Sequence, residues 1–375
     1  MKIKHKLGIV FILLLISIFV LVSNLRSDNE QIEIGVIAPL TGPTAWWGEY
    51  VKQGIELAYE ELPLDERENI KLIWEDDQCS SQKGFGALRK LIMIDKVKYV
   101  LGPLCNEVSI PTENIFDENK VVSLTTGLPD SKIANMGEYH FSYLPEIKFL
   151  MEELAKYSYY TSNNRRIAII SLNDAYGYEN YLGFKEYFEN YGGKVVAEEF
   201  FDKSDTDMKV QLSKIKASNP DSILLIAYGP SLINVLKQME ELGISGMDIY
   251  GINSFEAPSL LLEVPELAEG IVYPRPADKG ASDSVRKFTE LYEQKYGAEN
   301  GVYTSNAYDS FKILINAIKK CGYDNQECVK KELSSVKDYA GANGLLSVDE
   351  RGVGTYRGVM LKTVKNRGFV SIKND

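Results

Sequence analysis

The side chains best suited to bind a small molecule lie in six short segments, each following a predicted β-strand. Each segment pairs an aromatic, hydroxyl or amide side chain with a glycine or with loop backbone. They are Trp46-Trp47-Gly48, Cys105-Asn106, Thr125-Thr126-Gly127, Tyr176-Gly177, Tyr228-Gly229 and Asn253-Ser254. A small-ligand site needs apolar walls and a few hydrogen-bonding groups. We therefore expect these segments to form one ligand-binding site.

Catalytic residues are scarce in this sequence. It has only two histidines, His5 and His140, which argues against histidine-dependent triads and histidine-based metal sites. No G-x-S-x-G or Walker motif occurs, and the Gly84-Phe85-Gly86 stretch lies in a predicted helix and lacks a third glycine. The Asp76-Asp77 pair fits a solvated loop or helix cap better than a glycosidase dyad. We predict a binding protein with no cofactor or metal, and an extracellular enzyme is the least favoured alternative.

Length and charge narrow the possible partners. The 375 residues are enough for two domains of ordinary size, and 45% apolar with 25% charged residues is typical of a folded globular protein. The net charge is −11, and the first 26 residues contain four basic and no acidic side chains, so the remainder is more acidic still. Because such a body binds a phosphate backbone poorly, we exclude nucleic acid as a partner.

The first 26 residues predict export. Three lysines precede the apolar run LGIVFILLLISIFVLV, residues 7–22, which can be extended to residue 25. This run lies between the usual length of a cleaved signal core and that of a spanning helix, and no small-x-small cleavage pattern follows it. We favour an uncleaved membrane anchor over a cleaved signal sequence. Lysines before the run and acids after it place the body outside the cytoplasm, in the periplasm or on the outer face of the membrane.

Strands and helices alternate through the first part of the body. Four apolar strands are predicted at 32–40, 71–76, 99–102 and 121–125, with helices at 49–61, 80–95 and 111–118 between them. This order indicates a parallel sheet covered on both faces. In open α/β sheets, ligands bind at the carboxyl ends of the strands, where the six segments lie.

The same alternation restarts at Arg165, after a seam near 143–148. The second run has predicted strands at 165–174, 194–200, 222–228 and 248–252, with helices at 177–190, 207–217 and 231–242. Helices at about 283–296, 304–320 and 326–337 and a strand-like tail at 341–370 then break the pattern. We expect two lobes, with late elements that return to the first lobe and make the hinge multi-stranded.

The four cysteines fit an oxidising compartment. They allow three pairings, of which sequence proximity favours Cys79 with Cys105 and Cys321 with Cys328. Such disulfides persist outside the cell. Four free buried thiols remain an alternative, whereas the absence of C-x-x-C spacing argues against a metal site.

Several stretches carry a family resemblance. IGVIAPLTGPTAWWGEYVKQGIELAYEEL resembles the amino terminus of the leucine/isoleucine/valine-binding proteins. DDQCSSQK followed by YVLGPLCNEVSIPTENIF resembles their disulfide-closed region, and RRIAIISLNDAYGY resembles the start of their second lobe. The resemblance covers about residues 32–365. These proteins are extracytoplasmic solute-binding proteins of branched-chain amino acid ABC importers.

The resemblance implies a type I periplasmic-binding fold of the α/β class. In this fold two Rossmann-like lobes with parallel sheets are joined by a three-segment hinge and clamp the ligand between them. On this basis we expect lobe 1 to comprise residues 31–145 plus about 275–348. Lobe 2 would comprise residues 146–274 plus about 349–375.

The resemblance also implies roles for individual residues. Trp47 would line the pocket, Tyr176 would open the contribution of the second lobe, and Tyr228 would form a second aromatic wall. Asn106, where the family usually has serine, would bind the ligand carboxylate. In the loop after the fourth strand, Gly127 and Leu128 match the family's backbone-donor turn. Thr125 or Thr126 would compensate for the threonine hydroxyl that many members supply from this loop.

Two departures from the family pattern concern the ligand. Pro129 stands where many members have a carboxylate-binding threonine, and proline has neither a hydroxyl nor an N–H. Asn253 or Ser254 stands where the second lobe usually supplies an acid for the ligand ammonium, and Glu256 is three residues away. Because an unpaired buried ammonium is costly, a neutral amide, a carboxylic acid or a peptide-like solute remains an alternative ligand.

We predict a monomeric solute-binding protein that captures a small polar ligand, an amino acid that is branched-chain or related, and delivers it to an ABC permease. The alternative is a membrane-anchored ligand-sensing ectodomain that acts with a separate signalling partner.

Overall fold

The computed structural model describes residues 31–127, 132, 137–276, 283–297, 301–355 and 358–372. The predicted signal or anchor, residues 1–26, lies outside these ranges, as do Leu128 and Pro129. Within the described ranges, none of the helices has the length and apolar content needed to cross a membrane.

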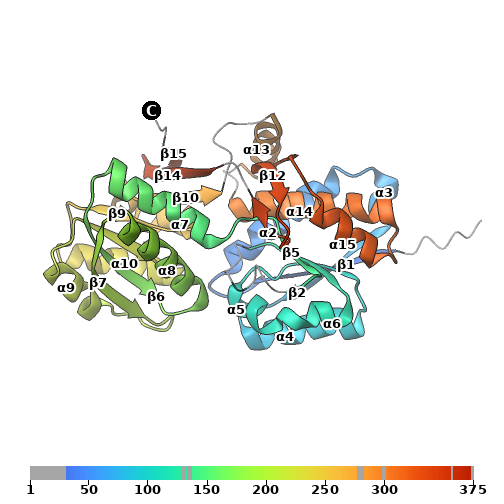
Figure 1. Ribbon diagram of the computed structural model, residues 1–375, viewed down its shortest axis with the longest axis horizontal. Coiled ribbons are helices and arrows are strands. Elements are labelled where there is room, and N and C mark those ends of the chain that lie inside the picture. The colour runs from blue at the N-terminus through green and yellow to red at the C-terminus, as the bar shows by residue number, and fades with distance from the viewer. Residues whose placement is uncertain are drawn as a thin grey trace, which may run out of the picture.

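The first sheet has five parallel strands in the order β2-β1-β3-β4-β5 (Figure 1). The strands are β1 (Ile32–Ala38), β2 (Ile70–Asp76), β3 (Tyr99–Leu101), β4 (Val122–Thr125) and β5 (His140–Ser142). The second half of β1 is fully buried, including Ile34, Val36 and Ile37. A strand that is apolar on both faces requires helices on both faces of its sheet.

Helices from two distant parts of the chain surround this sheet. The first group is α2 (Ala45–Glu60), α3 (Leu64–Glu68), α4 (Ser81–Arg89), α5 (Asn106–Ser109) and α6 (Glu113–Asn119). The later group is α13 (Asp283–Tyr296), α14 (Val302–Cys321) and α15 (Gln326–Ser334). Helix α14 packs along α2 (Figure 1). A Cβ atom on Gly54 would lie 2.1 Å from the Thr304 carbonyl oxygen, so glycine permits this close approach.

The second sheet has seven strands in the order β15-β14-β10-β9-β8-β6-β7. Its parallel strands are β6 (Arg166–Leu172), β7 (Lys194–Phe201), β8 (Ser222–Ile226), β9 (Asp248–Tyr250) and β10 (Val272–Pro276). The tail adds β14 (Val359–Lys365) and β15 (Gly368–Ser371) in antiparallel pairing, so this sheet is mixed rather than purely parallel as predicted. The two-residue turn at Asn366 and Arg367, both with positive φ, forces this hairpin reversal.

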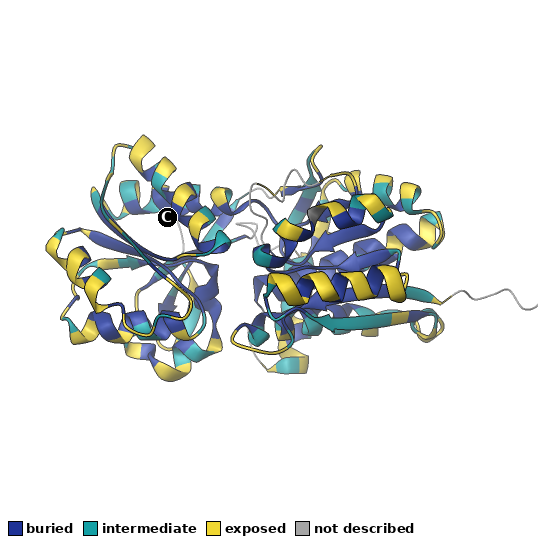
Figure 2. Cartoon of the chain, turned by 90° about the horizontal axis from the view of Figure 1, so that it is seen from below, coloured by how far each residue is buried: buried dark blue, intermediate teal, exposed yellow. Residues whose placement is uncertain are grey.

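The helices around the second sheet are α7 (Ile147–Lys156), α8 (Ala175–Asn190), α9 (Lys209–Ala217), α10 (Pro230–Glu241), α11 (Pro258–Glu263) and α12 (Pro265–Ala268). A small third sheet contains β11 (Tyr339–Gly341), β12 (Gly344–Val348) and β13 (Gly354–Thr355). Figure 2 shows two bodies side by side, each with a buried centre and exposed outer helix faces. The chain passes between the two large sheets after β5, after β10 and before β14. This architecture confirms the predicted two-lobed α/β fold.

Two helices next to the expected ligand segments differ from the sequence prediction. Helix α2 starts at Ala45 rather than near residue 49, so Trp46 and Trp47 lie in its first turn and not in a loop. A Cβ atom on Gly48 would lie 2.1 Å from the Pro39 carbonyl oxygen, so this glycine lets the helix begin directly against the end of β1. Helix α5, which begins at Asn106, was not predicted; the helix predicted at 111–118 corresponds to α6, which begins at Glu113.

The four cysteines form the two disulfides that sequence proximity favoured. Cys79 pairs with Cys105, with their Cα atoms 5.4 Å apart, and Cys321 pairs with Cys328, with a Cα separation of 5.6 Å. The alternative of four free thiols is therefore wrong. The first disulfide joins the loop after β2 to the residue that precedes Asn106, next to the expected ligand site.

Candidate ligand-binding site

A small cavity lies where the carboxyl ends of the two large sheets face each other. Its volume is about 20 Å³, which is room for about one water molecule. Residues from helices and loops that follow strands of both sheets, and one residue from α14, line it: Trp47, Leu104, Cys105, Asn106, Glu107, Tyr176, Tyr228 and Tyr303. Side chains of the protein therefore fill the space that a ligand would need, and a ligand can enter only if they move apart.

Four aromatic rings form the wall of this cavity. The Trp47 ring lies 4.9 Å from the Tyr228 ring, 5.9 Å from the Tyr303 ring and 6.3 Å from the Tyr176 ring, centroid to centroid. These tilted and edge-on pairs have favourable geometries for aromatic contacts. We call these four residues the aromatic cluster. Three of them were predicted, and the structure brings them together from α2, α8 and the loop after β8.

The amide of Asn253 lies behind the aromatic cluster and does not line the cavity. The Tyr176 hydroxyl donates to Asn253 Oδ1, and Asn253 Nδ2 donates to the Tyr303 hydroxyl at 3.0 Å. Ser254 Oγ donates to the Ala227 carbonyl oxygen at 2.7 Å. Both predicted residues therefore orient other parts of the site, and neither offers a free group to a ligand in this conformation.

The loop after β4 contributes differently at each position. Thr125 Oγ1 donates to the Pro103 carbonyl oxygen at 2.5 Å, so its hydroxyl is engaged by backbone. Thr126 Oγ1 is buried and has no hydrogen-bond partner. A Cβ atom on Gly127 would lie 1.9 Å from the Leu104 carbonyl oxygen, so this loop and the loop after β3 require glycine to pack together. Leu128 lies outside the described residues.

Two donors at the cavity have no hydrogen-bond partner among the residues that the structure describes. Trp47 Nε1 and Asn106 Nδ2 are both buried, and neither donates a hydrogen bond. Native structures leave few buried polar groups unpaired, because the lost hydration costs about 1–3 kcal/mol per group. These two N–H groups are therefore suited to bind an acceptor atom of a ligand.

Glu107 lines the cavity directly after Asn106, and the sequence analysis missed it. Its Oε1 atom is buried and has no hydrogen-bond partner within the described part of the chain. Burial, reinforced by the nearby Asp174 carboxylate, raises the pKa of Glu107 to about 7. Its position shortly after a strand was the sequence signal that could have identified it as a site residue. The family resemblance, however, predicted an acid only in the second lobe.

Tyr303 was missed because it comes from far along the chain. It lies in the first turn of α14, one residue before the predicted helix start at 304. The expectation that late helices return to the first lobe was the one signal that could have placed it near the site.

Asp174 fixes the position of Tyr228, a member of the aromatic cluster. Asp174 Oδ1 accepts from the Gly177 backbone N–H at 2.7 Å and caps α8, while Oδ2 accepts from the Tyr228 hydroxyl at 2.5 Å. Since both carboxylate oxygens are engaged, Asp174 holds the Tyr228 ring in position at the cavity wall.

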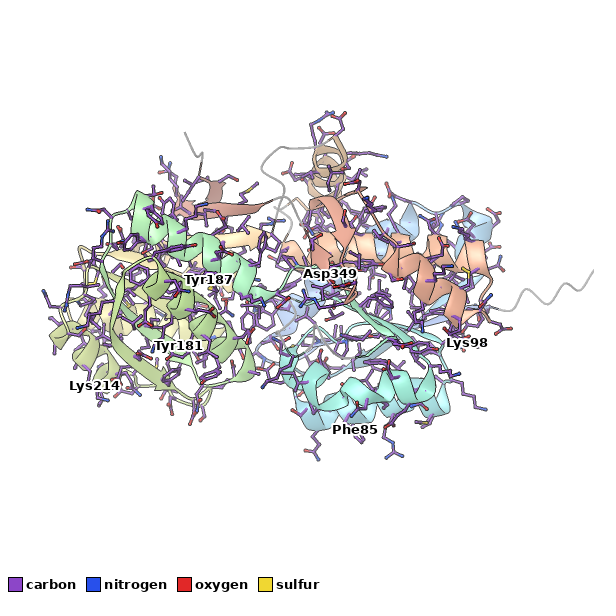
Figure 3. The ribbon with its side chains drawn as sticks, in the orientation of Figure 1. Phe85, Lys98, Tyr181, Tyr187, Lys214 and Asp349 are labelled. Atoms are coloured by element: carbon purple, nitrogen blue, oxygen red, sulfur yellow. A yellow bond between two sulfur atoms is a disulfide. The ribbon has the colours of Figure 1, made fainter. Side chains whose placement is uncertain are left out.

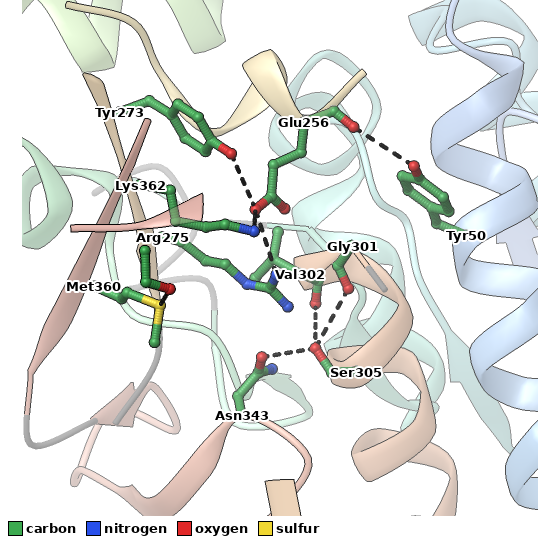
Figure 4. A network of polar contacts seen from close by, with 11 residues as sticks. Tyr50, Glu256, Tyr273, Arg275, Gly301, Val302, Ser305, Asn343, Met360 and Lys362 are labelled. Carbon is green, nitrogen blue, oxygen red and sulfur yellow. Dashed lines mark hydrogen bonds and ion pairs between the residues drawn. The ribbon is translucent and has the colours of Figure 1, made fainter. Parts of the chain in front are cut away.

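Glu256 is not a free acid at the site. Its Oε1 atom accepts from Lys362 Nζ at 2.9 Å, from Arg275 at 3.3 Å and from the Tyr273 hydroxyl at 3.4 Å (Figure 4). Burial alone would raise the pKa of Glu256, but Arg275 and Lys362 outweigh it and hold this pKa below its usual value. Glu256 thus belongs to a buried charge network that joins β10 and β14.

The surroundings of His140 indicate a structural role in the core. Its ring stacks on Phe116 with a centroid distance of 5.6 Å, and Nδ1 lies 3.2 Å from Ser123 Oγ. Complete burial lowers the pKa of His140 to about 4, so the ring is neutral at physiological pH.

Within the described part of the chain, one group of residues has the compactness of a metal site. It consists of Asp77, Cys79 and Cys105. The two cysteines are bonded to each other, so they have no thiolate to offer a metal.

A second cavity of about 210 Å³ lies away from the predicted ligand segments. Tyr187 of α8 and Arg351 are among its lining residues, and Arg351 is ion-paired with Glu146 and Asp349 at 2.7 Å each. Figure 3 labels Tyr187 in one body and Asp349 in the other. None of the predicted site residues that the structure describes lines this cavity.

Comparisons with known proteins agree with this fold. A family model described as periplasmic binding protein matches residues 31–367. The Leu/Ile/Val-binding protein BraC3 of Rhizobium johnstonii is 26% identical over 330 residues, which cover 86% of this chain and 89% of that protein. The leucine-, isoleucine-, valine-, threonine-, and alanine-binding protein of Pseudomonas aeruginosa is 22% identical and covers 86% and 87%.

Solved structures show the same architecture. The crystal structure of a leucine binding protein, LivK, from Thermotoga maritima matches with a TM-score of 0.85 and 26% identity, covering 91% of this chain and 98% of that one. A solute binding protein from Rhodopseudomonas palustris in complex with benzoate matches with a TM-score of 0.83 at 18% identity, covering 91% and 95%. At that identity the second match shows the fold alone.

These comparisons confirm the predicted type I periplasmic-binding fold and the resemblance to the leucine/isoleucine/valine-binding proteins. The family consists of extracytoplasmic binding proteins rather than enzymes, which agrees with a site built from aromatic rings and hydrogen-bond donors. The chain belongs to the periplasmic binding protein family.

Proposed function

We propose that this protein captures a small amino acid, branched-chain or related, between its two lobes and delivers it to an ABC importer. The observation that carries the proposal is the cavity between the two sheets, where the aromatic cluster meets the unpartnered N–H groups of Trp47 and Asn106. Rings suit an apolar side chain, and the free donors suit a carboxylate. The names of the relatives support the same ligand class.

Capture requires the lobes to separate. A cavity of about 20 Å³ is too small for an amino acid, and the Trp47–Tyr228 contact spans both sheets. We propose lobe 1 as residues 31–145 with about 275–348, and lobe 2 as residues 146–274 with about 349–375. Opening about the three crossovers admits the ligand, and closure around it presents one defined shape to a permease. The chain would act as a monomer, held at the membrane by its amino-terminal segment.

Thermal unfolding of the full-length chain in mild detergent tests this proposal. The panel contains L-leucine, L-isoleucine, L-valine, L-threonine, L-alanine, their amides, their deaminated acids and benzoate. A ligand at 100 times its dissociation constant adds about 2.7 kcal/mol of stability, which is a readable shift. Branched-chain amino acids should raise the unfolding midpoint. A shift with benzoate alone would contradict the amino acid assignment, and no shift with any compound would contradict the proposal.

A matched pair of tryptophan variants locates the binding event. Trp47→Ala removes a cavity-lining ring, whereas Trp46→Ala removes the neighbouring, half-buried ring that does not line the cavity. The first variant should lose the ligand-induced shift and the second should keep it. Equal loss in both variants would place the ligand elsewhere.

A further inference from the structure

We propose that Glu107 is the residue that binds the ligand ammonium, so that the acid of the site comes from the first lobe. This inference rests on the proposed function and specifies its ligand class as zwitterionic α-amino acids. The sequence comparison had assigned this role to the segment at Asn253 and Ser254, which has no acid.

Three acids lie at or near the aromatic cluster, and two are already engaged. Both oxygens of Asp174 accept hydrogen bonds, from Gly177 and from Tyr228. Glu256 is held by Lys362 and Arg275. Glu107 is the one of these three acids that lines the cavity, and its carboxylate oxygen Oε1 is buried without a hydrogen-bond partner among the described residues. Oε2 of Glu256 is also unpartnered, but Glu256 does not line the cavity.

The surroundings of Glu107 favour an added positive charge. Two nearby carboxylates, Asp174 at the start of α8 and Asp77 after β2, disfavour the ionised form of Glu107. Glu107 in turn lies close enough to Tyr228 to disfavour ionisation of that phenol. Lys203, after β7, favours the ionised form of Glu107. Its Nζ atom, however, lies over the Tyr228 ring, 5.0 Å from the ring centroid. No ion pair joins Lys203 to Glu107 within the described residues. A buried carboxylate without a paired cation is costly, and a ligand ammonium removes that cost.

The remaining unpartnered groups complete an amino acid site. Trp47 Nε1 and Asn106 Nδ2 are donors only, and they match the acceptor atoms of a carboxylate. Asn106 and Glu107 are adjacent in the chain and both line the cavity. An α-amino acid likewise carries its carboxylate and ammonium on one carbon, so one ligand can reach the donors and the acid together.

Asn253 cannot take over the charge. Its amide is neutral, and both ends are engaged, by the hydroxyls of Tyr176 and Tyr303. It orients two rings of the cluster toward the apolar part of the ligand. The acid therefore comes from the first lobe, whereas the aromatic rings come from both lobes.

Isothermal titration of the full-length chain tests the inference with two probes, L-leucine and its deaminated analogue 4-methylvaleric acid. The wild-type chain should bind L-leucine more tightly. Glu107→Gln should weaken L-leucine binding by about 10- to 100-fold, the usual effect of losing a charge-assisted hydrogen bond, and leave the acid unchanged or tighter. Glu107→Asp, which keeps the charge, should retain the preference for L-leucine. Glu118→Gln, at an exposed position of α6, is the matched control and should behave as wild type.

Failure of the inference and failure of the proposed function give different results. If wild type binds L-leucine and Glu107→Gln binds it equally well, Glu107 is not the ammonium partner and the proposed function stands. If wild type binds 4-methylvaleric acid at least as tightly as L-leucine, the inference is overturned without reference to any variant. If wild type binds no amino acid, both fall.

Discussion

The rings of Trp47 and Tyr228 lie 4.9 Å apart, although one belongs to the first turn of α2 and the other follows β8 of the second sheet. This contact closes the cavity between the two sheets. Under the proposed function, the surface that would bind the ligand is therefore covered by the protein itself in this conformation. Ligand affinity then depends on how readily these rings separate and on what replaces their contact.

Removing the Tyr228 ring should weaken both closure and binding. Tyr228→Ala deletes the contact with Trp47 and the hydrogen bond to Asp174. We expect at least tenfold weaker binding of L-leucine by isothermal titration, and a larger radius of gyration for the ligand-free protein in small-angle scattering. Tyr228→Phe keeps the ring and loses only the hydroxyl, so it should retain most of the affinity. Equal binding by Tyr228→Ala and wild type would refute a role for this wall.

Amino acid affinity should depend on pH between about 5 and 7. The pKa of Glu107 is raised to about 7 in the ligand-free protein, and an ammonium ligand favours the ionised carboxylate. Binding should therefore strengthen as pH rises through this window, by at most tenfold per pH unit, and level off above it. Asp77, with its pKa raised to about 6, titrates in the same window, and Asp174, Lys203 and Tyr228 also face Glu107.

Glu107→Gln isolates the contribution of this carboxyl to the pH profile. The difference between wild type and the variant should contain the rise near pH 7, measured by titrations with L-leucine at half-unit intervals. The ligand-free stability should show the opposite trend. A carboxyl with a raised native pKa binds more protons folded than unfolded, so wild type loses stability relative to the variant as pH rises from about 4.5 to 7. Superimposable profiles would count against an ionisable Glu107 at the site.

The two disulfides should differ in their effect on binding. Cys79→Ser with Cys105→Ser opens a loop of 26 residues next to Asn106 and should cost about 3 kcal/mol of unfolding free energy. It should also weaken L-leucine binding, because Asn106 and Glu107 follow Cys105 directly. Cys321→Ser with Cys328→Ser is the control, since neither residue lines the cavity. That control should lower stability in a denaturant titration and leave affinity unchanged; weaker binding there would argue that general destabilisation explains both results.

Glu256 should matter for stability and not for ligand choice. Glu256→Gln removes the negative charge shared by Lys362 and Arg275 and should cost about 3 kcal/mol, as expected for a broken buried ion pair. Its preference for L-leucine over 4-methylvaleric acid should equal that of wild type. A variant that folds but no longer distinguishes the two compounds would show that Glu256, rather than Glu107, recognises the ammonium.

Local patterns were sufficient to predict most of the fold. Apolar strands such as 32–38 and 222–226 are buried on both faces, and this leaves a continuous signal in the sequence. The sequence analysis did not foresee α7. It predicted a strand-like tail, which contains β14 and β15, but not their antiparallel pairing at the edge of the second sheet. Strand direction at a sheet edge depends on contacts between distant segments, which periodicity does not encode.

The site was harder to predict because its polar groups are distributed by long-range contacts. The aromatic residues Trp47, Tyr176 and Tyr228 were recognisable from strand ends, whereas Tyr303 reaches the cavity from a helix that follows the second run. Whether an acid is free also depends on distant partners. Lys362 forms an ion pair with Glu256 from 106 positions away in the chain, whereas none of the described residues donates a hydrogen bond to Oε1 of Glu107.

The central claim is that one amino acid binds between the lobes against the aromatic cluster. Isothermal titration of L-leucine into the full-length chain, beside Trp47→Ala, tests it most directly. The account predicts saturable binding with one site per chain in wild type and a loss of at least tenfold in the variant. Absence of binding for L-leucine, L-isoleucine and L-valine, or equal binding by Trp47→Ala, would contradict it.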